Sequence, residues 1–164
     1  SLEGPVSEDW VIEMAGLLVT AGSDRIGLSD TTGYANPSQI RRMFRRLRGE
    51  IGEKKMAGAH LHNTRGQGLA NVVAALDVDV TTFDSSLGGL GGCPFAPGAT
   101  GNIVTEDLVF MLEAMGLHTG IDLDKLIATR EVLLTGLPDE VIYGNVPEAG
   151  LPKGFTYASG RNIK

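Results

Sequence analysis

The N-terminal segment has the spacing of an amphipathic helix. Ser7 suits the N-cap position, and Glu8 and Asp9 place negative charge in the first turn. The apolar positions that follow recur every three or four residues, and they are Val11, Met14, Ala15 and Leu18. Gly22 suits the position just beyond a helix end. The pattern therefore predicts a helix that runs from Ser7 up to Gly22.

Short apolar runs and helical segments alternate along the rest of the chain. Asn36, Pro37 and Gln39 have the order of an N-cap, a first helical residue and a third one. Strands are predicted over residues 25–28, 56–62 and 78–83, and helices over 36–51, 66–76, 105–115 with Thr105 as the cap, and about 122–135. We expect one domain, with strand and helix units to about residue 136 and an irregular tail over 137–164.

The three predicted strands end in similar sequences. Polar residues and a glycine follow each one, in the segments DTTG at 30–33, NTRG at 63–66 and DSS at 84–86 before Gly88. Parallel α/β sheets, and barrels above all, build their active face from such residues. The sequence therefore predicts a parallel α/β fold. Three strands are too few for a closed eight-stranded barrel.

Composition narrows the class of protein. The chain has 164 residues, of which 42% are hydrophobic and 21% charged, and a mean hydropathy of +0.04, as in a globular domain. Lys and Arg number 14 against 20 Asp and Glu, so neither nucleic acid nor an anionic membrane is an expected partner. The one basic cluster has helical spacing and is interpreted as a solvated helix face; its members are Arg41, Arg42, Arg45, Arg46 and Arg48.

Cysteine and glycine usage add two further indications. A single cysteine, Cys93, excludes an internal disulfide. No apolar run approaches the ~20 residues of a membrane span. We therefore expect a cytoplasmic protein. Glycine makes up 23 of 164 residues, about 14%, roughly twice the usual share. Most of the excess lies between Gly88 and Gly101, and a loop so rich in glycine is typical of close approach to a ligand.

Two groups of residues are candidates for chemistry. In His60-Leu61-His62 the strand period of two directs both imidazoles to one face, which is half of a metal site or a hydrogen-bonded polar pair at a sheet edge. Cys93 lies among glycines and a proline, where proton transfer is favoured over the role of a small buried residue. Asn102 and Asp30, taken alone, also fit simple turn positions.

Two longer segments resemble a known family. HLHNTRGQGLAN at 60–71 and GLGGCPFAPGATGNIVTEDLVFMLE at 89–113 resemble the 3-hydroxy-3-methylglutaryl-CoA lyases, and the second contains the cysteine-loop signature of that family. The likeness extends from about Glu3 to Gly154 and includes SDTTG and AGLPKGF. Related synthases share the His-x-His strand but have another loop at Cys93, so the loop favours the lyase.

The resemblance implies the C-terminal half of a (β/α)8 barrel that binds Mg²⁺ or Mn²⁺. His60, His62 and Asn102 match metal ligands, while Cys93 matches a catalytic cysteine. Asp30 matches an acid/base aspartate, and His60 is expected to assist catalysis as well.

The implied reaction cleaves 3-hydroxy-3-methylglutaryl-CoA into acetoacetate and acetyl-CoA. Substrate contacts are implied at Gly91, Gly92 and Asn102. The Arg-Asp pair that the family carries on its first barrel strand is missing, so we expect this chain alone to bind metal weakly and to turn over slowly. An incomplete barrel is also expected to form a homo-oligomer or to pair with the other half. Two alternatives stay open: a non-catalytic half-barrel module, and a lyase for a related hydroxyacyl-CoA.

Overall fold

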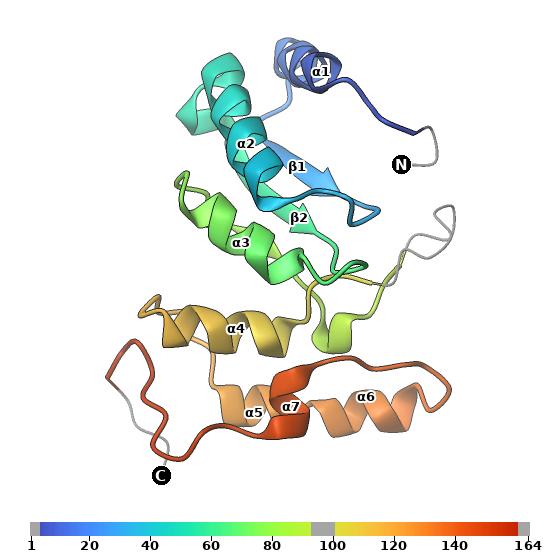
Figure 1. Ribbon diagram of the computed structural model, residues 1–164, viewed down its shortest axis with the longest axis vertical. Coiled ribbons are helices and arrows are strands. Elements are labelled where there is room, and N and C mark those ends of the chain that lie inside the picture. Colours follow the sequence, from blue (N-terminus) through green and yellow to red (C-terminus); the bar gives the residue numbers. More distant parts are fainter. Residues whose placement is uncertain (1–3, 93–100, 161–164) are drawn as a thin grey trace. The chain divides into compact units, whose positions relative to one another are not determined.

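The computed structural model describes residues 4–92 and 101–160, which form two compact units. The sheet unit takes the described residues of 1–84 and 91–102. The helical unit takes those of 85–90 and 103–164. Each is described by itself, with element labels as in Figure 1.

The sheet unit contains three parallel strands in the order β1-β2-β3. They are β1 (Ile26–Asp30), β2 (Met56–Leu61) and β3 (Phe83–Asp84). Asp30 lies opposite Leu61, and His60 lies opposite Asp84, so the carboxyl ends of all three strands meet at one edge. The predicted parallel α/β arrangement is confirmed.

The third strand is shorter than the predicted range 78–83. After α3 (Gly68–Leu76) the chain turns, and the amides of Val78 and Val80 both donate to the Ala75 carbonyl at 3.1 Å. Asp79 between them has φ +60°, which lies outside the β region. Val78 and Val80 are buried all the same. Their alternation therefore reflects burial in a turn rather than a strand.

Glycines without side chains allow the strands to approach. A Cβ atom at Gly58 would lie 2.5 Å from the Thr82 carbonyl oxygen of the neighbouring segment. A Cβ atom at Gly27 would lie 2.7 Å from the Gly58 carbonyl oxygen. The pairing of β1 with β2 is irregular between Ile26 and Leu28, next to this close approach. Any larger residue at Gly58 would push against backbone.

Helices α1 (Glu8–Thr20) and α2 (Pro37–Ile51) begin at the predicted caps. The Ser7 hydroxyl accepts from the Trp10 amide at 3.5 Å, and the Asn36 side chain accepts from the Gln39 amide at 3.1 Å. Helix α2 packs between α1 and α3 (Figure 1), and its apolar stripe is buried. That stripe consists of Ile40, Met43, Phe44 and Leu47. A 3-10 turn, η1 (Glu53–Lys55), leads from α2 into β2.

The basic cluster of α2 forms ion pairs within the sheet unit. Arg42 binds Glu8 at 2.6 Å, and Arg41 binds Asp77 at 2.7 Å. Both arginine side chains keep at least a third of their surface exposed. These contacts agree with a solvated helix face.

The helical unit contains η2 (Leu87–Gly89), α4 (Thr105–Ala114), α5 (Leu123–Ala128), α6 (Arg130–Gly136) and α7 (Asn145–Ala149). Two expectations were wrong here. The helix predicted over 122–135 is divided at Thr129 into α5 and α6. The N-cap of α4 is Val104 and not the predicted Thr105, whose hydroxyl is hydrogen-bonded to that of Ser85 at 2.9 Å. The predicted irregular tail contains the short helix α7.

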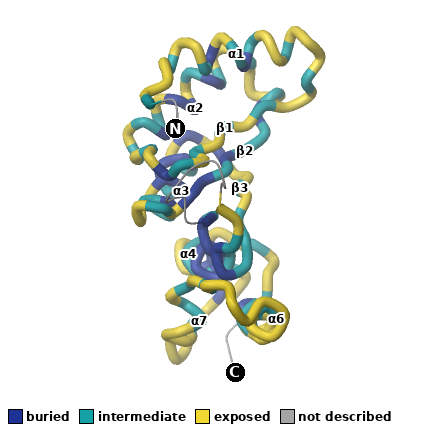
Figure 2. Tube along the Cα trace, turned by 90° about the vertical axis from the view of Figure 1, so that its right-hand side faces the viewer, coloured by how far each residue is buried: buried dark blue, intermediate teal, exposed yellow. Residues whose placement is uncertain are grey.

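An apolar cluster forms the core of this unit. Val109, Leu123 and Tyr157 are buried, with Phe110 and Phe155 stacked beside them at 5.1 Å between ring centroids. Figure 2 shows α4 as the buried element and α6 as a largely exposed one. Among the described residues, no helix is long and apolar enough to cross a membrane.

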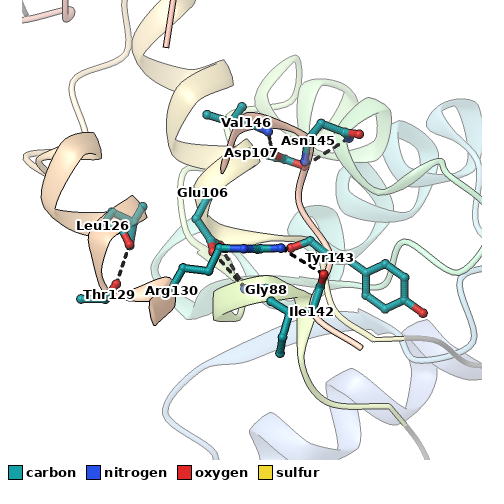
Figure 3. A network of polar contacts seen from close by, with 10 residues as sticks. All are labelled: Gly88, Glu106, Asp107, Leu126, Thr129, Arg130, Ile142, Tyr143, Asn145 and Val146. Carbon is teal, nitrogen blue, oxygen red and sulfur yellow. Dashed lines mark hydrogen bonds and ion pairs between the residues drawn. The ribbon is translucent and has the colours of Figure 1, made fainter. Parts of the chain in front are cut away.

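Buried charges connect α4 to the later part of the helical unit (Figure 3). Both Glu106 oxygens accept from the Gly88 amide, at 3.1 and 3.2 Å. Arg130 lies 3.7 Å from Glu106 and donates to the carbonyls of Ile142 and Tyr143, at 3.0 and 2.6 Å. A fully buried carboxylate is therefore balanced by one arginine and one amide.

Candidate metal and active site

The two histidines of β2 converge at the carboxyl edge of the sheet. Their Nε2 atoms are 3.2 Å apart and their ring centroids 5.2 Å apart, as the strand period of two predicts. His62, just beyond the strand, is buried with 5% exposure, while the His60 side chain keeps 35%. His62 is therefore the more buried of the two residues, and His60 is the more accessible one.

Asn102 is brought to His62 by backbone pairing. The two residues form an isolated antiparallel bridge, and the Asn63 amide next to it donates to the Gly101 carbonyl at 3.3 Å. The Asn102 side-chain amide donates to the Gly91 carbonyl at 3.3 Å. The backbone pairing therefore places Asn102 beside His62, whose ring in turn lies next to that of His60.

Asp84 is a member of the site that the sequence analysis did not single out. Its carboxylate lies 3.3 Å from Nδ1 of His60, on the other side of the ring from Nε2. A carboxylate that accepts from the outer ring nitrogen is the usual partner of a metal-binding histidine, because it fixes the tautomer and the ring orientation. The signal was available: Asp84 ends the next parallel strand, in register with His60.

Asp30 forms a turn at the end of β1. Its two carboxylate oxygens accept from the amides of Tyr34 and Ala35 at 3.0 and 3.1 Å. This is the turn role that the sequence left open beside the acid/base role. Each oxygen keeps a second lone pair, so the two roles are compatible.

Burial is the main influence on the protonation of His62. It lowers the pKa of His62 below the usual value, the neighbouring His60 lowers it further, and the charge of Asp30 opposes both. A neutral imidazole is the form that binds metal.

The residues present fit part of the coordination sphere of a divalent ion. Adjacent ligands of an octahedral ion lie about 3 Å apart when each is about 2.1 Å from the ion, close to the spacing of the two Nε2 atoms. The buried Nδ1 of His62 has no hydrogen-bond partner among the described residues. Two imidazoles with an amide oxygen suit Mn²⁺ or Mg²⁺ when water or substrate oxygens complete the set.

Three other expected site residues lie within or next to residues 93–100, which the structure does not describe. Cys93 is outside the described residues. Gly91 and Gly92 are exposed beside it, and Gly91 has φ +96°. A Cβ atom there would lie 2.9 Å from the amide nitrogen of Asn102, so a side chain at Gly91 would displace Asn102. Within the described parts of the chain, His, Cys, Asp and Glu form no group of three that could hold an ion alone.

The chain is similar in sequence to known acyl-CoA lyases. The chain is 44% identical over 129 residues to the hydroxymethylglutaryl-CoA lyase of Bacillus subtilis, covering 79% of this chain and 43% of that protein. It is 46% identical over 131 residues to the (R)-citramalyl-CoA lyase of Chloroflexus aurantiacus, covering 80% of this chain and 41% of that protein. The chain thus spans less than half the length of these relatives.

Solved structures of hydroxymethylglutaryl-CoA lyases also resemble this chain over about half of their length. The HMG-CoA lyase of Acinetobacter baumannii, in complex with coenzyme A and 3-methylmalate, superposes with a TM-score of 0.84 at 46% identity, over 90% of this chain and 48% of that one. The carboxyl transferase domain of Rhizobium etli pyruvate carboxylase, at 24% identity and a TM-score of 0.60, shares the fold alone. The HMGL-like family model matches residues 3–133. This chain belongs to the HMGL-like family.

Proposed function

We propose that the chain carries part of the active site of a divalent-metal-dependent lyase that cleaves 3-hydroxy-3-methylglutaryl-CoA into acetoacetate and acetyl-CoA. The observation that carries the proposal is the convergence of His60, His62 and Asn102 at the carboxyl edge of a parallel sheet. A divalent cation held by these residues would polarise the C3 hydroxyl of the substrate.

The residues of this chain would move two protons. Asp30 or His60 removes the proton of the C3 hydroxyl, a C3 carbonyl forms, and the bond between C2 and C3 breaks. The electron pair of that bond remains on C2 as the enolate of acetyl-CoA. The thiol of Cys93 then donates a proton to C2, which completes acetyl-CoA and releases acetoacetate. Asp84 holds the ring of His60 in place during these steps.

Metal binding and product release test this proposal. Titration with Mn²⁺ should give a dissociation constant above the micromolar range, because two neutral imidazoles and an amide supply no negative ligand. Binding should be lost in His62→Ala and kept in His118→Ala, whose histidine is exposed in the helical unit. Acetoacetate release with Mg²⁺ should be slow and should disappear in Cys93→Ala. Metal binding that survives in His62→Ala would contradict the proposal.

A lyase for a related hydroxyacyl-CoA is the second candidate, and the 46% identity to a citramalyl-CoA lyase favours considering it. Citramalyl-CoA is shorter by one methylene group, and the same bond cleavage yields pyruvate instead of acetoacetate. A pocket distinguishes one methylene by about 10–200-fold. Release of both products should therefore be measured side by side. If neither exceeds the Cys93→Ala background, the chain is better described as a non-catalytic half-barrel module.

We also propose that the chain associates, either with itself or with another half-barrel. In the described part of the sheet, β1 and β3 each have one side without a neighbouring strand. Open edges of this kind favour pairing with another chain.

A further inference from the structure

The loops that follow β1 and β2 are held together at the carboxyl edge of the sheet. Arg65 donates from Nη1 to the Thr32 carbonyl at 2.8 Å. Its guanidinium carbon lies 3.7 Å from the centroid of the Tyr34 ring. Gly33 and Thr64 are also in close approach, since a Cβ atom at Gly33 would lie 2.8 Å from that of Thr64. Two contacts of its own, with Thr32 and Tyr34, therefore position this exposed arginine.

The loop that follows β1 and carries Tyr34 is held by hydrogen bonds of its own. Asp30 accepts from the amides of Tyr34 and Ala35, and the buried Asn71 of α3 donates to the Ala35 carbonyl at 2.9 Å. The Tyr34 ring is thus placed by its own backbone contacts, although 60% of the residue is exposed. An exposed side chain held in this way loses little entropy on binding a ligand.

The charge of Arg65 is not balanced by a carboxylate. Among the described residues no aspartate or glutamate lies within 4.0 Å of its guanidinium, whereas Arg41, Arg42, Arg46 and Arg48 all have such partners. One N–H is used by Thr32, and the planar guanidinium has further donors for an oxyanion. Arg25 and Arg45 also lack such a partner among the described residues, but Arg65 is the one that follows β2 at the edge that carries the two histidines.

We propose that Arg65, stacked on Tyr34, binds an oxyanion of the acyl-CoA substrate at the entrance to the site. This inference rests on the proposed function for the identity of the ligand. Two oxyanions of that substrate have the required chemistry: the free carboxylate of the acyl group and the phosphates of coenzyme A. A guanidinium forms paired, charge-assisted hydrogen bonds with either of them.

Binding of two separate ligands distinguishes the sources. Coenzyme A carries phosphates and no carboxylate, and free 3-hydroxy-3-methylglutarate carries carboxylates and no phosphate. Each is titrated into the wild-type chain and into Arg65→Gln, Arg65→Lys and Arg25→Gln. Arg25 is the matched control, because it is an exposed arginine that precedes β1 at the opposite end of the strand.

Arg65→Gln is expected to weaken one of the two ligands by about tenfold or more, and Arg65→Lys by less. Arg25→Gln should bind both ligands like the wild type. The dependence of the dissociation constant on salt should also be reduced in Arg65→Gln, which a purely structural role of Arg65 would not produce. Circular dichroism checks that each variant is folded.

The outcomes separate this inference from the proposed function. Loss of coenzyme A affinity assigns the phosphates, and loss of diacid affinity assigns the carboxylate. The inference is overturned if Arg65→Gln and Arg25→Gln bind both ligands equally, or if the wild type binds neither at millimolar concentration. These titrations require no turnover, so a chain that releases no acetoacetate could still satisfy them.

Discussion

At the scale of single residues, Nδ1 of His60 connects strand β2 to the neighbouring strand β3. Nδ1 of this ring lies 3.3 Å from Asp84, which leaves Nε2 directed toward His62. The carboxylate selects the tautomer in which Nε2 is free to bind a cation. Asp84 is therefore a positioning residue for His60.

Asp84→Asn should weaken Mn²⁺ binding by about 10–100-fold, because the amide is a poorer and less oriented acceptor for the Nδ1–H group. Broadening of water or ligand resonances by Mn²⁺ measures the affinity at millimolar concentration. Asp77→Asn removes a carboxylate that binds Arg41 on the surface and should leave the affinity unchanged. Equal affinities in the two variants would exclude the positioning role.

Glu113 is a second residue with an unusual environment. It is 2% exposed, and it accepts from the Thr119 amide and hydroxyl and from the Ala158 amide, at 2.6, 2.7 and 2.8 Å. Burial raises the pKa of Glu113, but the hydrogen bonds from Thr119 and Ala158 and the nearby His118 lower it more. The net effect is that the pKa of Glu113 is lower than that of a free glutamate.

The helical unit should lose stability in acid because of this residue. A carboxylate with a lowered native pKa stabilises the fold above its unfolded pKa, and this contribution is lost as the pH falls below the unfolded pKa and through the native one. Glu113→Gln should reduce the free energy of unfolding at pH 7 by about 1–3 kcal/mol, because its NH₂ group would meet a donor. Urea unfolding between pH 3 and 7 measures both effects. An unchanged pH dependence in the variant would contradict the assignment.

At the scale of elements, the sequence predicts those whose signals are local. The helix at Pro37–Ile51 follows from Asn36 and Pro37, and the pairing of His60 with His62 follows from the strand period. The third strand was predicted with wrong bounds, 78–83 instead of Phe83–Asp84, since alternating Val78 and Val80 are buried by a turn with Asp79 at φ +60°.

Contacts between distant segments limited the rest of the prediction. The register between two strands decides which residues lie opposite each other, and a local sequence pattern gives no information about it. Asn102 was expected at the site through resemblance alone, and its antiparallel bridge with His62 could not be inferred from spacing. The position of Asp84 at the end of the third strand is visible in the sequence, but its pairing with His60 depends on the register of β3 with β2.

Arg130 connects several elements of the helical unit, so its loss should have a large effect on the stability of that unit. It begins α6, it is 13% exposed, and it holds both Glu106 and the carbonyls of Ile142 and Tyr143 (Figure 3). Arg130→Met should destabilise the helical unit by about 3–5 kcal/mol, because Glu106 would remain buried and charged. Lys125→Met, on the neighbouring helix and 85% exposed, should change the unfolding free energy by less than about 1 kcal/mol. Chemical denaturation compares the two variants, and equal effects would refute the argument.

At the scale of the whole molecule, exposed apolar residues and open strand edges favour association. In α1, Trp10 and Leu17 are 53% and 56% exposed, although a helix of this kind usually buries such residues. Contact with another chain over this helix would cover them.

The single tryptophan of the chain reports on this association directly. The emission of Trp10 should shift to shorter wavelength as protein concentration rises, in parallel with a larger sedimentation coefficient, because association removes water from the indole ring. Leu17→Lys should weaken both changes, and Val132→Lys, on α6 of the helical unit, serves as the control. A monodisperse monomer at all concentrations would contradict the expectation.

The bridge between His62 and Asn102 also has a consequence for the time course of synthesis. The two residues are separated by roughly 40 positions, and the chain is made at about 5–20 residues per second. His60 and His62 are therefore made several seconds before Asn102, and they leave the ribosome earlier than Asn102 by the same interval. Throughout that interval Asn102 is not yet available, so a metal captured by the two imidazoles would lack this ligand.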